Sequence, residues 1–219
     1  MTSTYSLFAA LLAAGMAAAP AALQHPVETR QQAAFADFTR RVQAYTDLRD
    51  MAARTVPPLK VSVDPTKIRH ASDALAFAIR LARADARQGD LFSPEIAAAF
   101  RIAVGAGCEG RYAELLEIIT DEWESPLPAP AVHARWPMGT PLPTMPPDLL
   151  AALPALPAGL EYRFMNRDLV LLDIDANLIV DFVPEAIPST TSRRRARQAG
   201  PMQAEIAAAR SCRESGDPL

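Results

Sequence analysis

The chain has few of the residues that form covalent or metal-based scaffolds. Its 219 residues include two cysteines and three histidines. His25, His70 and His133 are far apart and form no H-E-x-x-H motif, which argues against a zinc site. Cys108 and Cys212 are too few for a disulfide framework, and whether they pair with each other in an oxidising compartment is left open. Aromatic residues make up only 6% of the chain, so the core is modest.

The chain also lacks an excess of positive charge. Its formal net charge is −3, and of its 22 basic residues only Lys60 and Lys67 are lysines. This balance gives no overall attraction to nucleic acid or anionic lipid, so neither is expected as a partner. A basic cluster at 193–197 lies in the segment 189–219, which reads as a disordered tail. Whether the cluster binds an anion is left open.

Long apolar runs are missing after the first two dozen residues. A short polar start precedes an apolar stretch at 7–19, and Ala19-Pro20-Ala21 has the small-x-small pattern of a cleavage site. This predicts a signal peptide over 1–21 and a periplasmic or secreted protein. A retained anchor or a cytosolic chain with an apolar tail are the alternatives. The stretch is rich in alanine and interrupted by Gly15, which disfavours an anchor, so no stable span is expected after cleavage.

The remaining chain, 22–188, has the size of one domain and begins with helices. Apolar residues recur every three or four positions in three segments. The second and third have strong start signals, Asp64-Pro65 and Ser93-Pro94, each a capping residue followed by a first-turn proline. Short connections favour antiparallel packing of neighbouring helices. The predicted helices cover 29–54, 65–88 and 94–120.

The second half of the domain contains two segments whose sequence patterns differ from those of the helices. Half of the 20 prolines fall in 126–158, which predicts an extended strap, with one helical turn around Asp148, that wraps the helices. Over 160–183 the apolar period becomes two, which predicts a three-stranded antiparallel β-meander. Its middle segment, Leu169–Leu172, is apolar without alternation, so both of its faces should be covered. The predicted fold class is α+β.

Two motifs suggest ligands, but their contexts argue against them. Gly105-Ala106-Gly107-Cys108-Glu109-Gly110 matches G-x-G-x-x-G. A helix enters it where a dinucleotide site needs a strand, so we interpret it as a break between two helical pieces. Asp173-Ile174-Asp175-Ala176-Asn177 opens like a calcium loop, yet Leu178 and Pro184 stand where Gly and Glu belong. Turn chemistry explains its polar residues without a metal, although a looser calcium site is a weaker alternative.

No catalytic, cofactor-binding or metal-binding residue is assigned from the sequence. Cys108 has no identifiable base, and no G-x-S-x-G elbow is present. Asp168, Asp173, Asp175 and Asp181 could cluster on the meander. Acids at strand ends usually mark solubility and edge protection, and that is the interpretation adopted for them.

Several segments together carry a family likeness. They are 42–45, 57–59, 88–95, 146–154, Leu160-Glu161-Tyr162-Arg163-Phe164, Arg167-Asp168-Leu169-Val170-Leu171 and Asn177-Leu178-Ile179-Val180-Asp181-Phe182. In these segments, across 42–188, the chain resembles a group of uncharacterised exported bacterial proteins. The resemblance implies an envelope or secreted location and one domain, with no activity to carry over.

The functional expectation is an exported, non-catalytic interaction or structural module of the cell envelope. Its partner would be another envelope protein, because a large apolar strap on a small core can offer a docking groove. The alternative is a small envelope hydrolase or metal-dependent enzyme that uses the aspartates of the meander. The sequence does not indicate the oligomeric state.

Overall fold

The computed structural model describes residues 25–58, 63–120, 126–137, 139–142 and 145–189, and it confirms the α+β class. The predicted signal peptide and all but the first residue of the predicted tail lie outside the described residues. None of the described helices is both long and apolar enough to cross a membrane. The elements, in chain order, are α1 (His25–Ala53), α2 (Pro65–Ala82), α3 (Pro94–Gly107), α4 (Tyr112–Thr120), α5 (Pro147–Ala151), β1 (Leu160–Met165), β2 (Asp168–Asp173) and β3 (Leu178–Val183).

The two capping signals act as predicted. The Asp64 carboxylate accepts a hydrogen bond from the Thr66 N–H at 2.9 Å, and the Ser93 hydroxyl accepts one from the Ile96 N–H at 3.5 Å. The expected end of the second helix at residue 88 is wrong, because α2 stops at Ala82. The residues after it form turns instead, which bring the N–H groups of the following loop to a buried carboxylate on β3.

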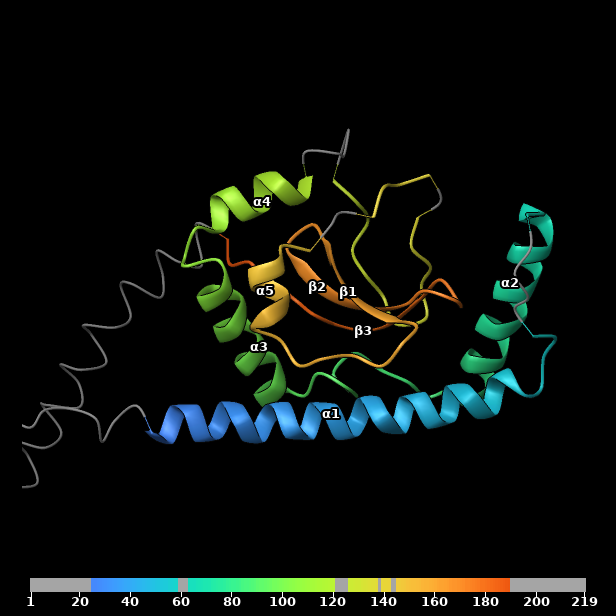
Figure 1. The fold of residues 1–219 in the computed structure, drawn as a ribbon, viewed down its shortest axis with the longest axis horizontal. Helices are drawn as coiled ribbons and strands as arrows, with labels where there is room; N and C mark the ends of the chain where they lie inside the picture. The colour runs from blue at the N-terminus through green and yellow to red at the C-terminus, as the bar shows by residue number, and fades with distance from the viewer. Residues whose placement is uncertain (1–24, 59–62, 121–125, 138, 143–144, 190–219) are drawn as a thin grey trace, which may run out of the picture.

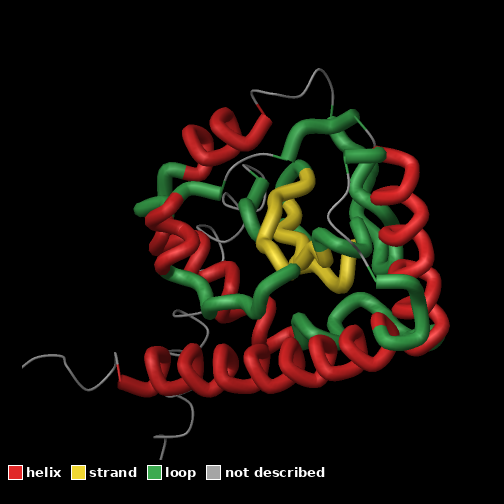
Figure 2. The backbone as a smooth tube through the Cα atoms, turned by 45° about the vertical axis from the view of Figure 1, so that its right-hand side comes forward, coloured by secondary structure: helices red, strands yellow, loops and turns green. Residues whose placement is uncertain are grey.

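The arrangement of the helices differs from the expected antiparallel packing. Figure 1 shows α1 along one side of the molecule, with α2 and α3 standing across it at different places and the sheet between them. The turned view in Figure 2 shows the same order of helix, sheet and helix. Both α2 and α3 pack on α1. Short connections therefore do not produce a bundle here, because the meander occupies the space between the two helices.

The meander has the predicted order β1-β2-β3, and both pairings are antiparallel. Its middle strand is covered on both faces as expected, since Leu169–Leu172 is fully buried. One face packs into the main core with α1 and α3, and the other packs on Trp136. The large side chains of the main core include Phe38, Phe92, Phe100, Tyr162, Leu169 and Leu171.

The proline-rich segment covers the sheet more than the helices. Trp136 packs on Val170, Leu172 and Ile179, which form the face of the sheet opposite to α1. Its later part, which includes α5, packs on α3, and residues 133 and 135 bond to Arg80 and Asp73 of α2. The expectation that it wraps the helices is therefore incomplete, because the strap also covers one face of the sheet. This cover keeps Val170, Leu172 and Ile179 away from water.

Candidate functional site

Asp173, at the end of β2, is fully buried and joins the sheet to α1. One of its oxygens accepts hydrogen bonds from the Tyr45 hydroxyl at 2.8 Å and from Arg49 Nε at 2.7 Å, and the other accepts one from the Ala176 N–H at 3.0 Å. Burial and the neighbouring Asp173 carboxylate raise the pKa of Tyr45 well above its usual range. Since the carboxylate is occupied by three donors, it is a structural anchor.

Asp175 completes this cluster from the turn between β2 and β3. Its carboxylate pairs with the second arm of the Arg49 guanidinium. The two aspartates of the calcium-like motif are thus used by Arg49, Tyr45 and the turn itself, and the Asn177 side chain donates to the Trp136 carbonyl at 3.4 Å, which agrees with the turn interpretation. A small cavity of about 130 Å³ lies next to this pair, between α1, α2 and residues 56–58. It is far smaller than an ordinary substrate pocket.

Asp181, on β3, is also fully buried and lies in a nest of backbone donors. Its oxygens accept hydrogen bonds from the N–H groups of Gly89, Leu91 and Phe92 at 2.8–3.2 Å. A further bond comes from the Phe182 N–H at 2.8 Å. Hydrogen bonds from N–H groups to a carboxylate are shorter and stronger than those to a neutral acceptor. This aspartate therefore fixes the loop after α2 against the edge strand β3.

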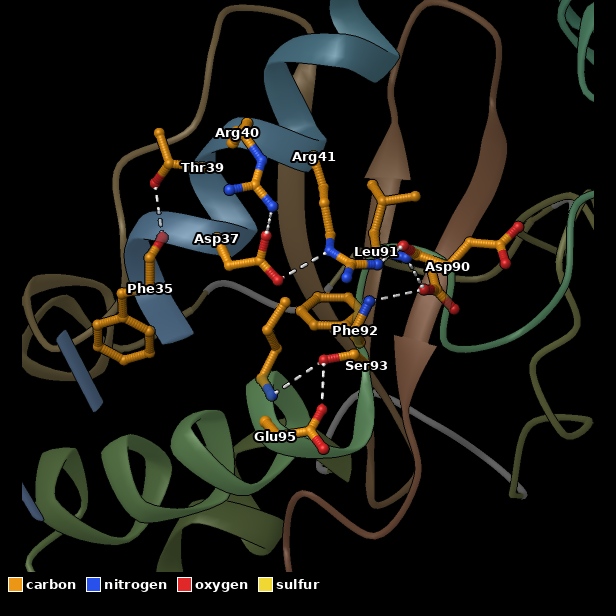
Figure 3. Close-up of polar contacts among 12 residues, drawn as sticks. Phe35, Asp37, Thr39, Arg40, Arg41, Asp90, Leu91, Phe92, Ser93 and Glu95 are labelled. Atoms are coloured by element: carbon orange, nitrogen blue, oxygen red, sulfur yellow. Dashed lines mark hydrogen bonds and ion pairs between the residues drawn. The ribbon is translucent and has the colours of Figure 1, made fainter. Parts of the chain in front are cut away.

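The same loop is held to α1 on its outer side, as Figure 3 shows. Arg41 donates a hydrogen bond of 2.6 Å to the Asp90 carbonyl and pairs with Asp37 at 3.1 Å. Ser93 ends the loop by capping α3, and its hydroxyl also donates to Glu95 at 3.0 Å. These contacts are exposed or only partly buried, so they position the loop with little stabilisation.

The interpretation of the meander acids as surface residues is wrong for Asp173 and Asp181. Asp168 is half-buried and accepts a hydrogen bond from the Glu185 N–H at 2.8 Å, and burial raises the pKa of its carboxyl. Among the described residues, no group of three or more His, Cys, Asp or Glu side chains could hold a metal ion. Asp173 and Asp175 share Arg49, whereas Asp168 and Asp181 each accept hydrogen bonds from separate backbone N–H groups.

The glycine-rich motif ends α3, as the sequence interpretation required. Glu109 and Gly110 have left-handed backbones, with φ of 52° and 75°. The Gly110 N–H bonds to the Gly105 carbonyl at 2.9 Å and the Glu109 N–H to the Ala106 carbonyl at 3.0 Å, which is the Schellman pattern of a helix end. The motif is therefore a helix terminus that leads into α4.

Close packing explains why glycine occurs inside the end of α3. A Cβ on Gly107 would lie 3.0 Å from the backbone Cα of Leu149 in α5, whereas one on Gly105 would lie 2.5 Å from the hydroxyl oxygen at the far end of the Tyr112 side chain. We expect Gly107→Ala to lower the free energy of unfolding by about 1–3 kcal/mol, because the backbone of α5 must shift. The measurement is urea denaturation, with Gly105→Ala as the matched control. Equal losses in the two variants would contradict the packing argument.

A second hollow, larger than the cavity beside Arg49, lies next to the outer edge of β1. We name it the β1 groove; it has a volume of about 350 Å³. Its walls come from the chain after α5 and from the start of β1. The lining residues are Leu150, Pro154, Ala155, Leu156, Leu160, Glu161, Tyr162 and Arg163.

The backbone next to the β1 groove has no strand partner on its outer side. The Ile174 N–H bonds to the Gly159 carbonyl at 2.9 Å, and orientation alternates along a strand, so odd-numbered residues of β1 face β2. The N–H and C=O of Tyr162 therefore point away from the sheet, and within the described ranges no backbone group bonds to them. At the rim, Arg163 pairs with Glu161.

The outer edge of β3, in contrast, is closed. Ile179 exchanges two backbone hydrogen bonds of 2.8 Å with the strap, one with His133 and one with Ala134. Arg83 donates to the Val180 carbonyl at 3.3 Å and Gln88 to the Phe182 carbonyl at 3.2 Å. The two edges of the sheet thus differ: the outer edge of β3 accepts or exchanges hydrogen bonds at Ile179, Val180 and Phe182, whereas no described residue bonds to the outward-facing backbone of Tyr162 beside the β1 groove.

Sequence reasoning missed both the buried aspartates and the β1 groove. A signal for Asp181 existed in Gly89, because a glycine between a helix and a capping motif indicates a loop with free N–H groups. No local signal marks the groove, since its walls meet only in three dimensions. No protein-family model, curated protein or solved structure matches the chain.

Proposed function

We propose that the protein is an exported, non-catalytic interaction module of the cell envelope that binds an extended segment of another envelope protein in the β1 groove. The export part of this proposal rests on the predicted signal peptide at 1–21 and on the resemblance to exported bacterial proteins. The binding part rests on one observation, the groove of about 350 Å³ beside the backbone N–H and C=O of Tyr162, to which no described residue bonds.

The chemistry of the β1 groove favours an extended peptide. An unpaired N–H and C=O on an edge strand are complemented best by the backbone of another strand, which supplies both a donor and an acceptor. The walls are mainly apolar, and Leu150 is 45% exposed there. The Arg163–Glu161 pair at the rim offers charge to flanking side chains. A partner segment would thus gain backbone hydrogen bonds and bury one or two apolar side chains.

The alternative, a hydrolase or metal-dependent enzyme that uses the meander aspartates, gains no support from the geometry. A general base needs free lone pairs that face the substrate. The carboxylates of Asp173 and Asp181 are fully buried and are occupied by donors of the protein itself. We therefore keep the interaction module as the proposed function.

The test compares two leucines of similar exposure. Leu150 lines the β1 groove, and Leu142 is 44% exposed in the strap outside it. A photo-crosslinking residue replaces Ala155 in the natural host, and mass spectrometry identifies the crosslinked partner peptide. We expect Leu150→Asp to reduce crosslinking about tenfold or more, because it places a charge in the apolar wall, whereas Leu142→Asp leaves it unchanged.

A synthetic copy of the crosslinked peptide then tests the binding mode. It should slow hydrogen exchange of the Tyr162 amide in the purified chain, because the bound segment pairs with that N–H. The proposal fails if no peptide crosslinks at position 155, or if both leucine variants behave alike. Turnover in a hydrolase assay that Asp173→Asn abolishes in a folded chain would favour the enzyme instead.

A further inference from the structure

The strap exchanges backbone hydrogen bonds with β3 at Ile179, and one side chain there, His133, can titrate. Asn177, directly before β3, also donates to the Trp136 carbonyl at 3.4 Å. The His133 N–H bonds to the Ile179 carbonyl, and the Ile179 N–H bonds to the Ala134 carbonyl, each at 2.8 Å. The next buried residue of the strap, Trp136, covers the outer face of the sheet. Detachment at Ile179 would therefore uncover both an edge and an apolar face.

Positive charge surrounds this attachment point. Arg80 of α2 donates from Nε and Nη2 to the His133 carbonyl, at 3.2 and 2.9 Å. Arg83, which follows α2, bonds to the Val180 carbonyl and lies over the Tyr45 ring of α1. Two guanidinium groups thus lie close to the His133 imidazole.

The remaining charged groups near His133 do not offset these guanidiniums. Within the strap, Arg135 is paired with Asp73 of α2. On β3, the residues that contact the strap carry no charge, and Asp181 is taken up by the loop at 89–92. No carboxylate that faces the imidazole from these elements is free to balance a proton on it.

The surroundings of the His133 imidazole favour its neutral form. Its Nε2 atom is buried and has no hydrogen-bond partner among the described residues. Burial and the two arginines hold the pKa of His133 below its usual value of 6.5. The backbone is left-handed there, with φ of 67°, a conformation that asparagine adopts more readily than histidine.

We infer that His133 is an acid-sensitive latch: the neutral imidazole keeps residues 131–136 on β3, and its protonation releases them from the strand edge. Protonation adds a third positive charge beside Arg80 and Arg83 and forces a buried nitrogen to carry a charge without an acceptor. The latch would give an envelope protein a second binding edge in acidic surroundings. It does not depend on the proposed occupant of the β1 groove.

The sign of the pH effect follows from the lowered pKa. A base that binds its proton less readily when folded loses its contribution to stability as the pH falls below the unfolded value, here 6.5. The raised pKa of Asp168 acts in the opposite sense, because its carboxyl is easier to protonate in the folded chain. Weakening of the strap contact between pH 7 and pH 5 is thus not explained by Asp168.

The experiment is amide hydrogen exchange of the whole chain at pH 7.5 and pH 5.0, compared as protection factors. We expect the protection of the Ile179 amide to fall about tenfold or more at pH 5.0, while that of Leu171 on β2 changes little. His133→Asn keeps a residue suited to the left-handed backbone and cannot titrate. In this variant the protection of Ile179 should be equal at the two pH values.

Two outcomes would overturn the latch. One is unchanged protection of Ile179 in the natural chain at pH 5.0, and the other is an equal fall in the His133→Asn variant. If that variant does not fold, an NMR titration of His133 in the natural chain decides the matter. A midpoint below 6.5 that coincides with the change in the Ile179 signal supports the latch, and a midpoint at or above 6.5 contradicts it.

Discussion

Asp181→Asn should lower the free energy of unfolding by about 3–5 kcal/mol, the largest effect we expect from a single polar substitution in this chain. The amide has one acceptor oxygen where the carboxylate has two, and its NH₂ group would face the N–H groups of the loop at 89–92. Buried donors without acceptors retain most of their desolvation cost. Urea denaturation at pH 7 measures the loss.

Asp90→Asn is the matched control for this prediction. Asp90 lies in the same loop, but it is exposed, and its carboxylate accepts a hydrogen bond from the Arg87 N–H at 2.8 Å. We expect its replacement to cost less than about 1 kcal/mol. A similar loss in both variants would mean that the loop, rather than the buried carboxylate, determines the effect.

Arg49→Met should cost about 3–5 kcal/mol, because it leaves the fully buried Asp173 carboxylate without its cation. The Arg49 side chain is only 13% exposed, so solvent screens this ion pair poorly. Arg40→Met removes a comparable side chain from the Arg40–Asp37 pair, where the arginine is 77% exposed. We expect that control to change stability by about 0.5 kcal/mol or less.

A double-mutant cycle separates the ion pair from packing. In the Arg49→Met, Asp173→Leu double variant, neither charge remains, so the combined loss should be clearly smaller than the sum of the single losses. We expect a coupling of about 2–3 kcal/mol between these two residues. If the losses of the two single variants simply add up in the double variant, the two side chains act independently. That result would contradict the anchor role of Asp173.

Local signals predicted the elements of this fold well. The pairs Asp64-Pro65 and Ser93-Pro94 place the starts of α2 and α3, since a cap and a first-turn proline act over a few residues. The change to a period of two places the meander, and the unbroken apolar run Leu169–Leu172 identifies its doubly covered strand. These features depend on the backbone and its nearest neighbours alone.

The errors concern partners that are distant in the sequence. Asp173 meets Tyr45 from 128 positions away, and Asp181 meets Gly89 from 92 positions away. Nothing in their own neighbourhoods distinguishes a buried acid with donors from a solvated acid at a strand end. The end of α2 was missed for the same reason. The chain leaves the helix after Ala82, and the N–H groups of Gly89, Leu91 and Phe92 then bond to Asp181 of β3.

The strap shows a third limit of predicting this fold from its sequence. Its prolines correctly exclude regular structure over most of its length, but they do not determine which surface it covers. That depends on where Trp136 finds apolar partners, and it finds them on the outer face of the sheet. The β1 groove is likewise formed by residues that approach only after the sheet and α5 are in place.

The link between Arg49 and Asp173 also determines when the fold can be completed. The two residues are 124 positions apart, so α1 is synthesised long before the strand that anchors it. Its apolar side, with Phe38, Val42 and Tyr45, lacks its sheet until residue 183 has been made. Contacts between residues this far apart form slowly, because a long stretch of chain must first be closed into a loop. Slow completion of the fold would be compatible with the export that we propose, since an exported chain crosses the membrane unfolded.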